Sequence, residues 1–381
     1  MNILYLETNL PPYCGGIERV TWLVSNYLEQ IGYHCFYGYK EEDFDDIDDA
    51  YKIKYNPYGT KEEILSVLDP FLKKNKIDII VNQGFYYRDF CEAMVLLKEK
   101  YHVGIVSCVH YSINELFSRN PNLSFKIKDL ICRIIFGHGM KARVLRPFYE
   151  CSDRLVMLSK TFFDDVVRFL EMKNVDRLCA IPNPLSYNQV TTPILNERKK
   201  QVFICSRLTD PQKNITGALR IWKEIEKRGY EEWCLIIAGT GEDETMLRNY
   251  AQDLKLKRVK WLGRVKDPMP FYQQSPIFMM TSNWEGWGMT LTEAMQAGCV
   301  PIAFDSYSSL HDIVTNNQDG VIVPYPDEIA YSNALENLMN DKERLQRLSS
   351  QGVISSQRFS IEIIGKQWEK LFEQIKKENE S

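Results

Sequence analysis

The sequence has no long hydrophobic run. No apolar stretch reaches the roughly 20 residues that a membrane-spanning helix needs. The opening residues, MNILYLE, have neither a basic flank nor a long apolar region, so we expect neither a signal peptide nor a membrane span.

An excess of basic charge is also missing. The formal net charge is -4, with 47 basic and 51 acidic residues. Non-specific affinity for nucleic acid depends on a basic surface. We therefore expect no nucleic acid among the partners of this protein.

The cysteines lack the C-x-x-C spacing that is typical of many redox and zinc sites. There are 10 cysteines, and most lie inside apolar runs such as VFICSRL. We expect reduced, buried thiols in a cytoplasmic protein. The sequence also shows no internal repeat and no low-complexity tract.

The chain is long and apolar enough for two cores, with 381 residues of which 44% are hydrophobic. Short β-rich runs alternate with segments of helical spacing, and the alternation starts a second time after a polar stretch. This pattern predicts an α/β protein with two Rossmann-like, doubly wound parallel sheets. The runs are NILYLE, CFYGYK, DIIVNQ, GIVSCVH, RLVMLS and CAIPN, then VFICSRL, WCLIIAGTG, VKWLGRV, PIFMMTS, VPIAFDS and GVIVP.

The polar stretch 186–200 is the predicted linker. We expect an N-terminal Rossmann-like domain at 1–187 and a C-terminal one at 199–360. The last residues, 361–381, have apolar positions at helical spacing. They predict an amphipathic helix that docks back toward the N-terminal domain.

The loop NWEGWG follows the predicted strand PIFMMTS and precedes a helix that Gly298 can end. Gly286 and Gly288 allow backbone N–H groups to approach a ligand, and the helix N-terminus after them favours a phosphate. Glu285 lies in the loop and Glu293 lies about one and a half turns into the helix. They suit separate acceptor roles toward different hydroxyl groups. The alternative is that Glu285 is exposed and Glu293 caps a neighbouring backbone.

Two further loops at predicted strand ends support a phosphate site. SRLTDPQKNITG places Arg207 and Lys213 on one strand-to-helix turn, with Asn214 as the predicted helix start. Two cations there can hold a diphosphate, although a solvated surface pair is the commoner fate of such residues. AGTGED again combines glycines, Gly239 and Gly241, with a helix start. Ligands of open α/β sheets bind at these carboxyl ends, so the loops should converge on one cleft.

These residues resemble the retaining glycosyltransferases of family 4, over nearly the whole chain. The most specific element is the E-x7-E signature from Glu285 to Glu293, which continues into AMQAGCVPIA. Other similar elements are GGIER at 15–19, VHY around His110, IPNP at 181–184, the Arg207 and Lys213 pair, and Gly239-Thr-Gly241. Ser206 departs from the glycine of many relatives, and the spacing from Arg207 to Lys213 is one residue longer than the shortest in the family.

The resemblance implies the GT-B fold, with two Rossmann-like domains facing across a cleft, the acceptor bound by the first and the nucleotide-sugar donor by the second. It implies roles toward the ribose for Glu293, the donor sugar for Glu285 and the diphosphate for Lys213. His110 would lie near the transferred sugar. The implied catalytic residues are Glu285, His110, Arg207 and Lys213. The implied donor-binding residues are Gly15, Gly16, Gly239, Gly241, Gly263, Arg264, Gly286, Trp287, Gly288, Met289, Thr290, Leu291 and Glu293.

The function implied is a hexosyltransferase-like enzyme of polysaccharide or glycoconjugate synthesis. It would move a sugar from a nucleotide diphosphate, UDP or GDP, to a hydroxyl of a glycan or lipid-linked acceptor, and would retain the anomeric configuration. No cofactor and no metal are expected. Two rivals stay open: a GT-B sugar-nucleotide epimerase or hydrolase, and a non-catalytic nucleotide-binding scaffold. The double glycine at 15–16 lacks the G-x-G-x-x-G pattern, which disfavours a nicotinamide dehydrogenase.

Two segments have a second interpretation. The acidic run 41–50 contains D-x-D at Asp43 and Asp45 and again at Asp46 and Asp48, but a solvated loop is the favoured interpretation. Residues 124–148 combine apolar positions at helical spacing with several lysines and arginines. This segment could contact an anionic membrane at its inner face or receive a lipid-linked acceptor; equally, it could be an amphipathic helix packed on the N-terminal domain.

Overall fold

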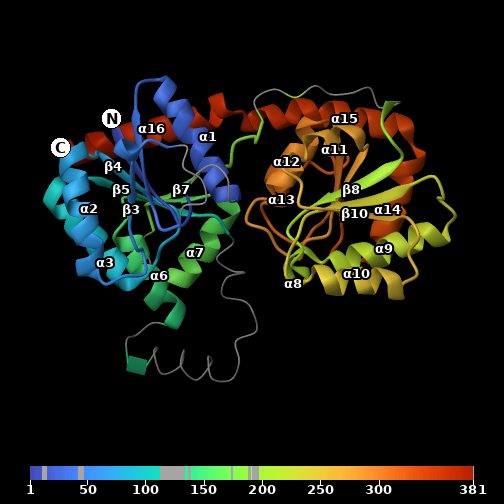
Figure 1. The fold of residues 1–381 in the computed structure, drawn as a ribbon, viewed down its shortest axis with the longest axis horizontal. Helices are drawn as coiled ribbons and strands as arrows, with labels where there is room; N and C mark the ends of the chain where they lie inside the picture. The colour runs from blue at the N-terminus through green and yellow to red at the C-terminus, as the bar shows by residue number, and fades with distance from the viewer. Residues whose placement is uncertain are drawn as a thin grey trace. The chain divides into compact units, whose positions relative to one another are not determined.

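A computed structural model of the chain describes residues 1–10, 15–41, 47–111, 134–135, 139–172, 175–187, 190 and 197–380. The chain forms two compact units (Figure 1). The N-terminal unit comprises residues 1–184 together with 361–381, and the C-terminal unit comprises residues 185–360.

The N-terminal unit contains a parallel sheet whose strand order, in the described residues, is β3-β2-β1-β4-β5-β6-β7. All six runs predicted as strands in this half are confirmed, and a seventh strand, β3, was missed because KIK has no apolar run. The strands are β1 Asn2–Leu6, β2 His34–Tyr39, β3 Lys52–Lys54, β4 Ile79–Asn82, β5 Gly104–Val109, β6 Arg154–Met157 and β7 Leu178–Ala180.

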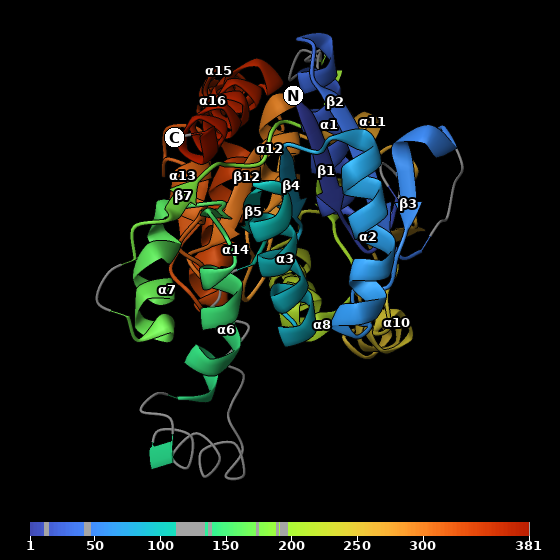
Figure 2. The same ribbon diagram turned by 90° about the vertical axis from the view of Figure 1, so that its left-hand side faces the viewer.

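The helices of this unit lie in two groups (Figure 2). Helix α1 packs against α16, whereas α2, α3, α6 and α7 follow one another as neighbours. The right-handed crossover rule places these groups on opposite faces of the sheet. The bounds are α1 Gly16–Gln30, η1 Asp49–Tyr51, α2 Lys61–Asn75, α3 Arg88–Tyr101, α6 Met140–Glu150, η2 Lys160–Phe162, α7 Phe163–Leu170 and α16 Ile361–Glu380.

Local sequence explains where several of these helices form. Thr60 and Glu63 form a capping box that satisfies backbone donors at the start of α2. In α16 the buried side chains recur at helical spacing, as the sequence predicts. Gly365 allows α16 to approach α1 closely, because a Cβ at this position would lie 2.3 Å from the Tyr27 ring.

The C-terminal unit contains a second parallel sheet of order β10-β9-β8-β11-β12-β13, so all six runs predicted here are confirmed. Its strands are β8 Gln201–Cys205, β9 Cys234–Ala238, β10 Val259–Gly263, β11 Ile277–Met280, β12 Val300–Phe304 and β13 Val321–Val323. Its helices are α8 Asp210–Lys213, α9 Ile215–Lys227, α10 Glu244–Asp253, α11 Met269–Gln274, α12 Met289–Gln296, α13 Leu310–Ile313, α14 Glu328–Asn340, α15 Lys342–Ser356 and η4 Gln357–Phe359. The core includes the fully buried Trp222 and Tyr331.

Each sheet has one point where the strand order reverses. In the N-terminal unit this point lies between β1 and β4, and in the C-terminal unit it lies between β8 and β11. Connections from adjacent strands leave in opposite directions there, which opens a crevice at the carboxyl ends. The loops after these strands are therefore where a ligand site is expected.

Some predicted features fall outside the described residues. Of the segment 124–148, only 134–135 and 139–148 are described, and both Ile134 and Ile135 are exposed. The membrane hypothesis therefore stays a prediction. In the described part of the chain, no helix combines the length and apolarity needed to cross a bilayer.

Candidate active site

The loop after β8 carries Lys213 at the end of the single turn α8. Asn214, with a φ of 49°, caps α9, and its side chain accepts a hydrogen bond from the Gly217 N–H at 3.2 Å. The predicted helix start is therefore confirmed. The backbone next to Lys213 is also held by the β11 loop, because the Thr281 hydroxyl donates to the Lys213 carbonyl at 3.1 Å.

Gly239 and Gly241 let the β9 loop pack directly against the β8 loop. A Cβ at Gly239 would lie 1.8 Å from the Ser206 carbonyl oxygen, and one at Gly241 would lie 2.3 Å from the Leu208 carbonyl oxygen. The Leu208 N–H donates to the Thr240 carbonyl at 2.9 Å. These glycines thus hold the two loops together, and their contact with a donor stays a prediction.

Glu285 lies in the loop after β11 and is only 6% exposed. Its Oε1 atom accepts hydrogen bonds from the Lys213 ammonium at 2.5 Å and from the Ser282 hydroxyl at 2.7 Å. The Lys213 side chain is itself 17% exposed. The sequence suggested separate partners for Lys213 and Glu285, but in the structure they form a largely buried ion pair.

The second oxygen of Glu285 has a different environment. No donor from the described part of the chain bonds to Oε2. A carboxylate oxygen can accept two hydrogen bonds. The pair therefore presents an acceptor, Oε2, next to a cation, which suits a ligand with both hydroxyl and phosphate groups.

Glu293 lies in α12 and is also 6% exposed. Its Oε1 accepts from the Ser186 hydroxyl at 2.6 Å and its Oε2 from the Tyr272 hydroxyl at 3.0 Å. Both of these contacts are with hydroxyl groups. The role of Glu293 toward a ribose stays a prediction.

Gly288 is the N-cap of helix α12, and its φ of 91° favours glycine. Met289, Thr290 and Leu291 form its first turn, where backbone N–H groups give a partial positive charge. Gly298, with a φ of 67°, follows the helix as predicted.

The remaining residues of this loop have structural contacts. Trp287 is buried and packs edge-on against Phe359, and Gly286 accepts a hydrogen bond from the Ser309 hydroxyl at 3.0 Å. These contacts hold the loop against the rest of the C-terminal unit.

Two predicted cations take no part in the Lys213–Glu285 ion pair. Arg207 and Arg264 are both exposed, and neither forms an ion pair within the residues that the structure describes. Arg264 follows Gly263, which has a φ of 68° and open space around it. The role of Arg207 toward the diphosphate and that of Arg264 in donor binding stay predictions.

In the N-terminal unit the predicted residues lie at the start of α1 and the end of β5. Gly15 caps α1, and the Glu18 carboxylate folds back over it, so that a Cβ at Gly15 would lie 2.7 Å from Glu18 Oε2. Gly16 is the first residue of the helix. His110 forms a hydrogen bond through Nε2 with Gln83 Oε1 at 2.6 Å.

Glu7, directly after β1, was not predicted. It is 2% exposed, and neither carboxyl oxygen has a partner with hydrogen-bond geometry in the described residues. Burial raises the pKa of Glu7 well above its ordinary value; the Thr21 hydroxyl acts in the opposite direction but is the smaller effect. Its place at a strand end could have drawn attention to it, but its burial could not be read from the sequence.

We expect Glu7→Gln to stabilise the protein increasingly as the pH rises. The folded chain keeps a proton on Glu7 that the unfolded chain loses above about pH 4.5. The contribution of Glu7 to the free energy of unfolding of the wild type is therefore fully present below that pH. It falls as the pH rises toward the pKa of Glu7 in the folded state, by at most about 1.4 kcal/mol per pH unit. Urea unfolding at pH 5 and pH 8 measures the difference, with the exposed Glu99→Gln as control. A difference that does not depend on pH would contradict the raised pKa.

The possible metal site of the acidic run is only partly described. Asp48 accepts a hydrogen bond from the Ala50 N–H at 2.8 Å, and Asp49 pairs with Lys52 at 3.3 Å. The other D-x-D carboxylates lie outside the described residues. Elsewhere in the described chain, no group of three or more His, Cys, Asp or Glu could hold a metal ion.

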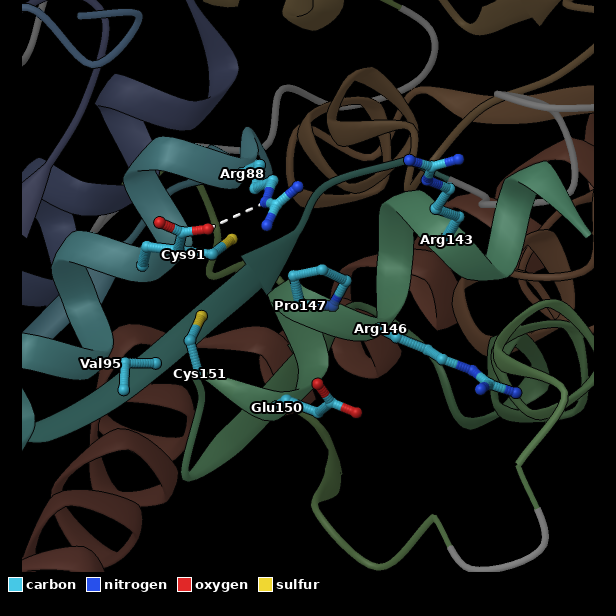
Figure 3. Close-up of a pocket in the computed structure, with 9 residues that line it drawn as sticks. Arg88, Cys91, Val95, Arg143, Arg146, Pro147, Glu150 and Cys151 are labelled. Atoms are coloured by element: carbon cyan, nitrogen blue, oxygen red, sulfur yellow. Dashed lines mark hydrogen bonds and ion pairs between the residues drawn. The ribbon is translucent and has the colours of Figure 1, made fainter. Parts of the chain in front are cut away.

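A hollow on the N-terminal unit lies between α3 and α6 (Figure 3). Two of its arginines already bind protein groups: Arg88 pairs with Glu92 at 2.8 Å, and Arg146 donates to the carbonyls of Leu170 and Glu171. Cys91 and Cys151, which also line it, are buried free thiols, as predicted for the cysteines. The hollow contains none of the predicted catalytic or donor-binding residues.

Several known proteins that this chain resembles are glycosyltransferases. The family described as "Glycosyl transferases group 1" matches residues 191–353, which lie wholly in the C-terminal unit. A glycosyltransferase of Haemophilus influenzae, named as uncharacterised, is 25% identical over 367 residues, covering 93% of this chain and 95% of the relative. A Campylobacter jejuni protein is 26% identical over 61% of this chain and 63% of its own length. It is named GalNAc-alpha-(1->4)-GalNAc-alpha-(1->3)-diNAcBac-PP-undecaprenol alpha-1,4-N-acetyl-D-galactosaminyltransferase.

Solved structures show the same fold. The sucrose-phosphate synthase of Thermosynechococcus elongatus superimposes with a TM-score of 0.76 at 16% identity, covering 98% of each chain. HepE of Anabaena, solved with UDP-glucose, gives a TM-score of 0.73 at 15% identity, covering 98% of this chain and all of that one. With its two parallel-sheet α/β units, the chain has the GT-B fold.

Proposed function

We propose that this chain is a retaining glycosyltransferase of polysaccharide or glycoconjugate synthesis. It moves a hexose-type sugar from UDP or GDP to a hydroxyl of a glycan or lipid-linked acceptor. The match of residues 191–353 to group 1 glycosyltransferases supports the reaction class. The observation that carries the proposal is the Lys213–Glu285 pair at the carboxyl ends of β8 and β11.

The pair can serve a nucleotide-sugar without coming apart. An ammonium group has three N–H donors, so Lys213 can keep one on Glu285 and direct the others to a diphosphate. Glu285 Oε2, which has no protein donor in the described chain, accepts from a hydroxyl of the donor sugar. The carboxylate thus orients the sugar, and the ammonium lies close to the bond that breaks.

The leaving diphosphate is the group that most needs stabilisation. When the bond from the anomeric carbon to the phosphate oxygen breaks, negative charge develops on the diphosphate. Lys213, Arg207 and the N-terminus of α12 offset that charge. The acceptor oxygen forms the new bond on the same face, and its proton passes to the departing phosphate oxygen. No covalent enzyme intermediate is needed, and Glu285 acts through hydrogen bonds.

Nucleotide binding tests the proposal first. At about 100 times its dissociation constant, a ligand that binds only the folded state should stabilise it by about 2.7 kcal/mol. We expect thermal unfolding to shift with UDP or GDP and not with ADP or CDP, and the shift to persist in EDTA. The absence of a shift with any of the four nucleotides would contradict the proposal.

The same sample separates the rival enzyme classes. Consumption of the matching sugar nucleotide that depends on an added glycan or lipid-linked acceptor identifies a transferase. Consumption at the same rate without acceptor would identify an epimerase or hydrolase, and binding without consumption would identify a scaffold.

A further inference from the structure

A chain of hydrogen bonds ends on His110 at the carboxyl edge of the N-terminal sheet. His110 follows β5 and contacts Gln83, which follows the adjacent strand β4, through Nε2 and Oε1 at 2.6 Å. The Gln83 amide then donates from Nε2 to the Thr21 hydroxyl of α1 at 2.9 Å. The hydrogen bonds thus link the ends of β4 and β5 to helix α1, and all three elements belong to the N-terminal unit.

The surroundings of this ring keep it uncharged. Burial lowers the pKa of His110 to about 4, although part of the residue reaches solvent. The pocket that contains His110, Gln83 and Thr21 is lined by no Asp, Glu, Lys or Arg. Tyr5 and Cys108 line this pocket and Glu7 follows β1, and burial raises the pKa of each, which favours the uncharged form.

A neutral imidazole carries a single N–H, and its partner decides which nitrogen holds it. Gln83 presents its carbonyl oxygen to His110 because its amide N–H groups are directed at Thr21. Nε2 must therefore be the protonated nitrogen. This leaves Nδ1 as an acceptor, with no protein donor in the described part of the chain.

The orientation of the Gln83 amide, seen in its contact with Thr21, sets the tautomer of His110. If the Gln83 amide were flipped, its oxygen would face Thr21 and its NH2 group would face His110, which would force the opposite tautomer. In the structure the amide nitrogen faces Thr21 and donates to its hydroxyl at 2.9 Å, which leaves the amide oxygen for His110.

We propose that Gln83 is a positioning residue for the transfer reaction, which fixes His110 as a hydrogen-bond acceptor toward a hydroxyl of the substrate. This inference rests on the proposed function. It adds that the N-terminal unit offers an uncharged ring nitrogen to a substrate hydroxyl. Loss of the Gln83 carbonyl frees the tautomer and the ring orientation, whereas the fold keeps its core.

The tautomer is measured directly on the full chain labelled with 15N-histidine. The protein has five histidines, and His110→Gln identifies the His110 signals by their disappearance. We expect the wild type to show a protonated Nε2 and a bare Nδ1. Gln83→Leu should give a mixture of tautomers, and Gln30→Leu, at an exposed site on α1, should change nothing. A wild-type Nδ1–H tautomer, or the same tautomer in Gln83→Leu, would overturn the proposal.

Kinetics with the sugar nucleotide found active then test the role in the site. Gln83→Leu should lower kcat/KM about 10-fold, the loss that one hydrogen bond near 1.4 kcal/mol produces. Gln83→Glu keeps an acceptor but adds a negative charge, which raises the pKa of His110 from about 4. Activity of this variant should fall as the pH drops through the new pKa, because protonation removes the acceptor at Nδ1.

The possible failures can be told apart. Wild-type kinetics in both Gln83 variants would overturn the positioning role while the proposed function stands. A wild type that consumes no sugar nucleotide would refute the proposed function and, with it, the kinetic role of Gln83. A Gln83→Leu that does not fold is replaced by Gln83→Glu, whose pH profile must differ from that of the wild type.

Discussion

Replacing Lys213 with methionine should lower the turnover number by about 100- to 1000-fold. Removal of one preorganised donor from a site of developing negative charge typically has an effect of this size. Lys213 meets the condition because its side chain is 17% exposed and its ammonium is held on Glu285 at 2.5 Å. Methionine preserves most of the side-chain volume and removes only the charge and its donors.

The measurement is the steady-state rate of sugar transfer at saturating donor. Lys227→Met is the matched control, because Lys227 is an exposed lysine of the same unit that pairs with Glu224 on α9. Its rate should equal that of the wild type. A Lys213→Met enzyme that stays folded and retains more than a tenth of the wild-type rate would rule out the assignment of Lys213 to the diphosphate.

Glu285→Gln should lower the free energy of unfolding by about 3 kcal/mol, because breaking a buried ion pair leaves its partner as an uncompensated charge. The carboxylate is 9% exposed at the side chain, and it is the sole ion-pair partner of Lys213 in the described chain. This differs from the view that the sequence suggests, in which Glu285 serves a ligand only. The variant should also lose transfer activity, because Oε2 no longer offers a charged acceptor to the sugar.

A double-mutant cycle separates stability from function. Combined with Lys213→Met, Glu285→Gln should cost less than the sum of the two single changes, because no buried charge is then left alone. Activity should stay absent in the double variant. Urea unfolding of the four proteins gives the coupling energy, and strictly additive losses would show that the pair is not coupled.

The architecture could be predicted closely from the sequence. Twelve apolar runs correspond to twelve of the thirteen strands in the described residues, because a strand buried on both faces must be apolar along its length. The missing strand, β3, lies at the edge of its sheet and reads KIK. An edge strand needs no continuous apolar run, so its sequence carried no signal.

The candidate residues were also visible, but their contacts were not. Lys213 and Glu285 could be chosen because each follows an apolar run, at the end where ligands of parallel sheets bind. They are 72 residues apart, and they meet because β8 and β11 are neighbours in the sheet. Strand order depends on how whole elements cross over and pack, and no local pattern records it.

The sequence alone thus determined the two sheets, the helices between them and the strand-end residues that could carry chemistry, since periodicity and turn residues act over a few neighbouring positions. Only the tertiary structure decided which of these residues are partners: Glu285 holds Lys213, and Gln83 holds His110. It also decided burial, which lowers the pKa of His110 to about 4 and raises the pKa of Glu7. Desolvation depends on everything that packs around a group, and most of those neighbours are remote in the chain.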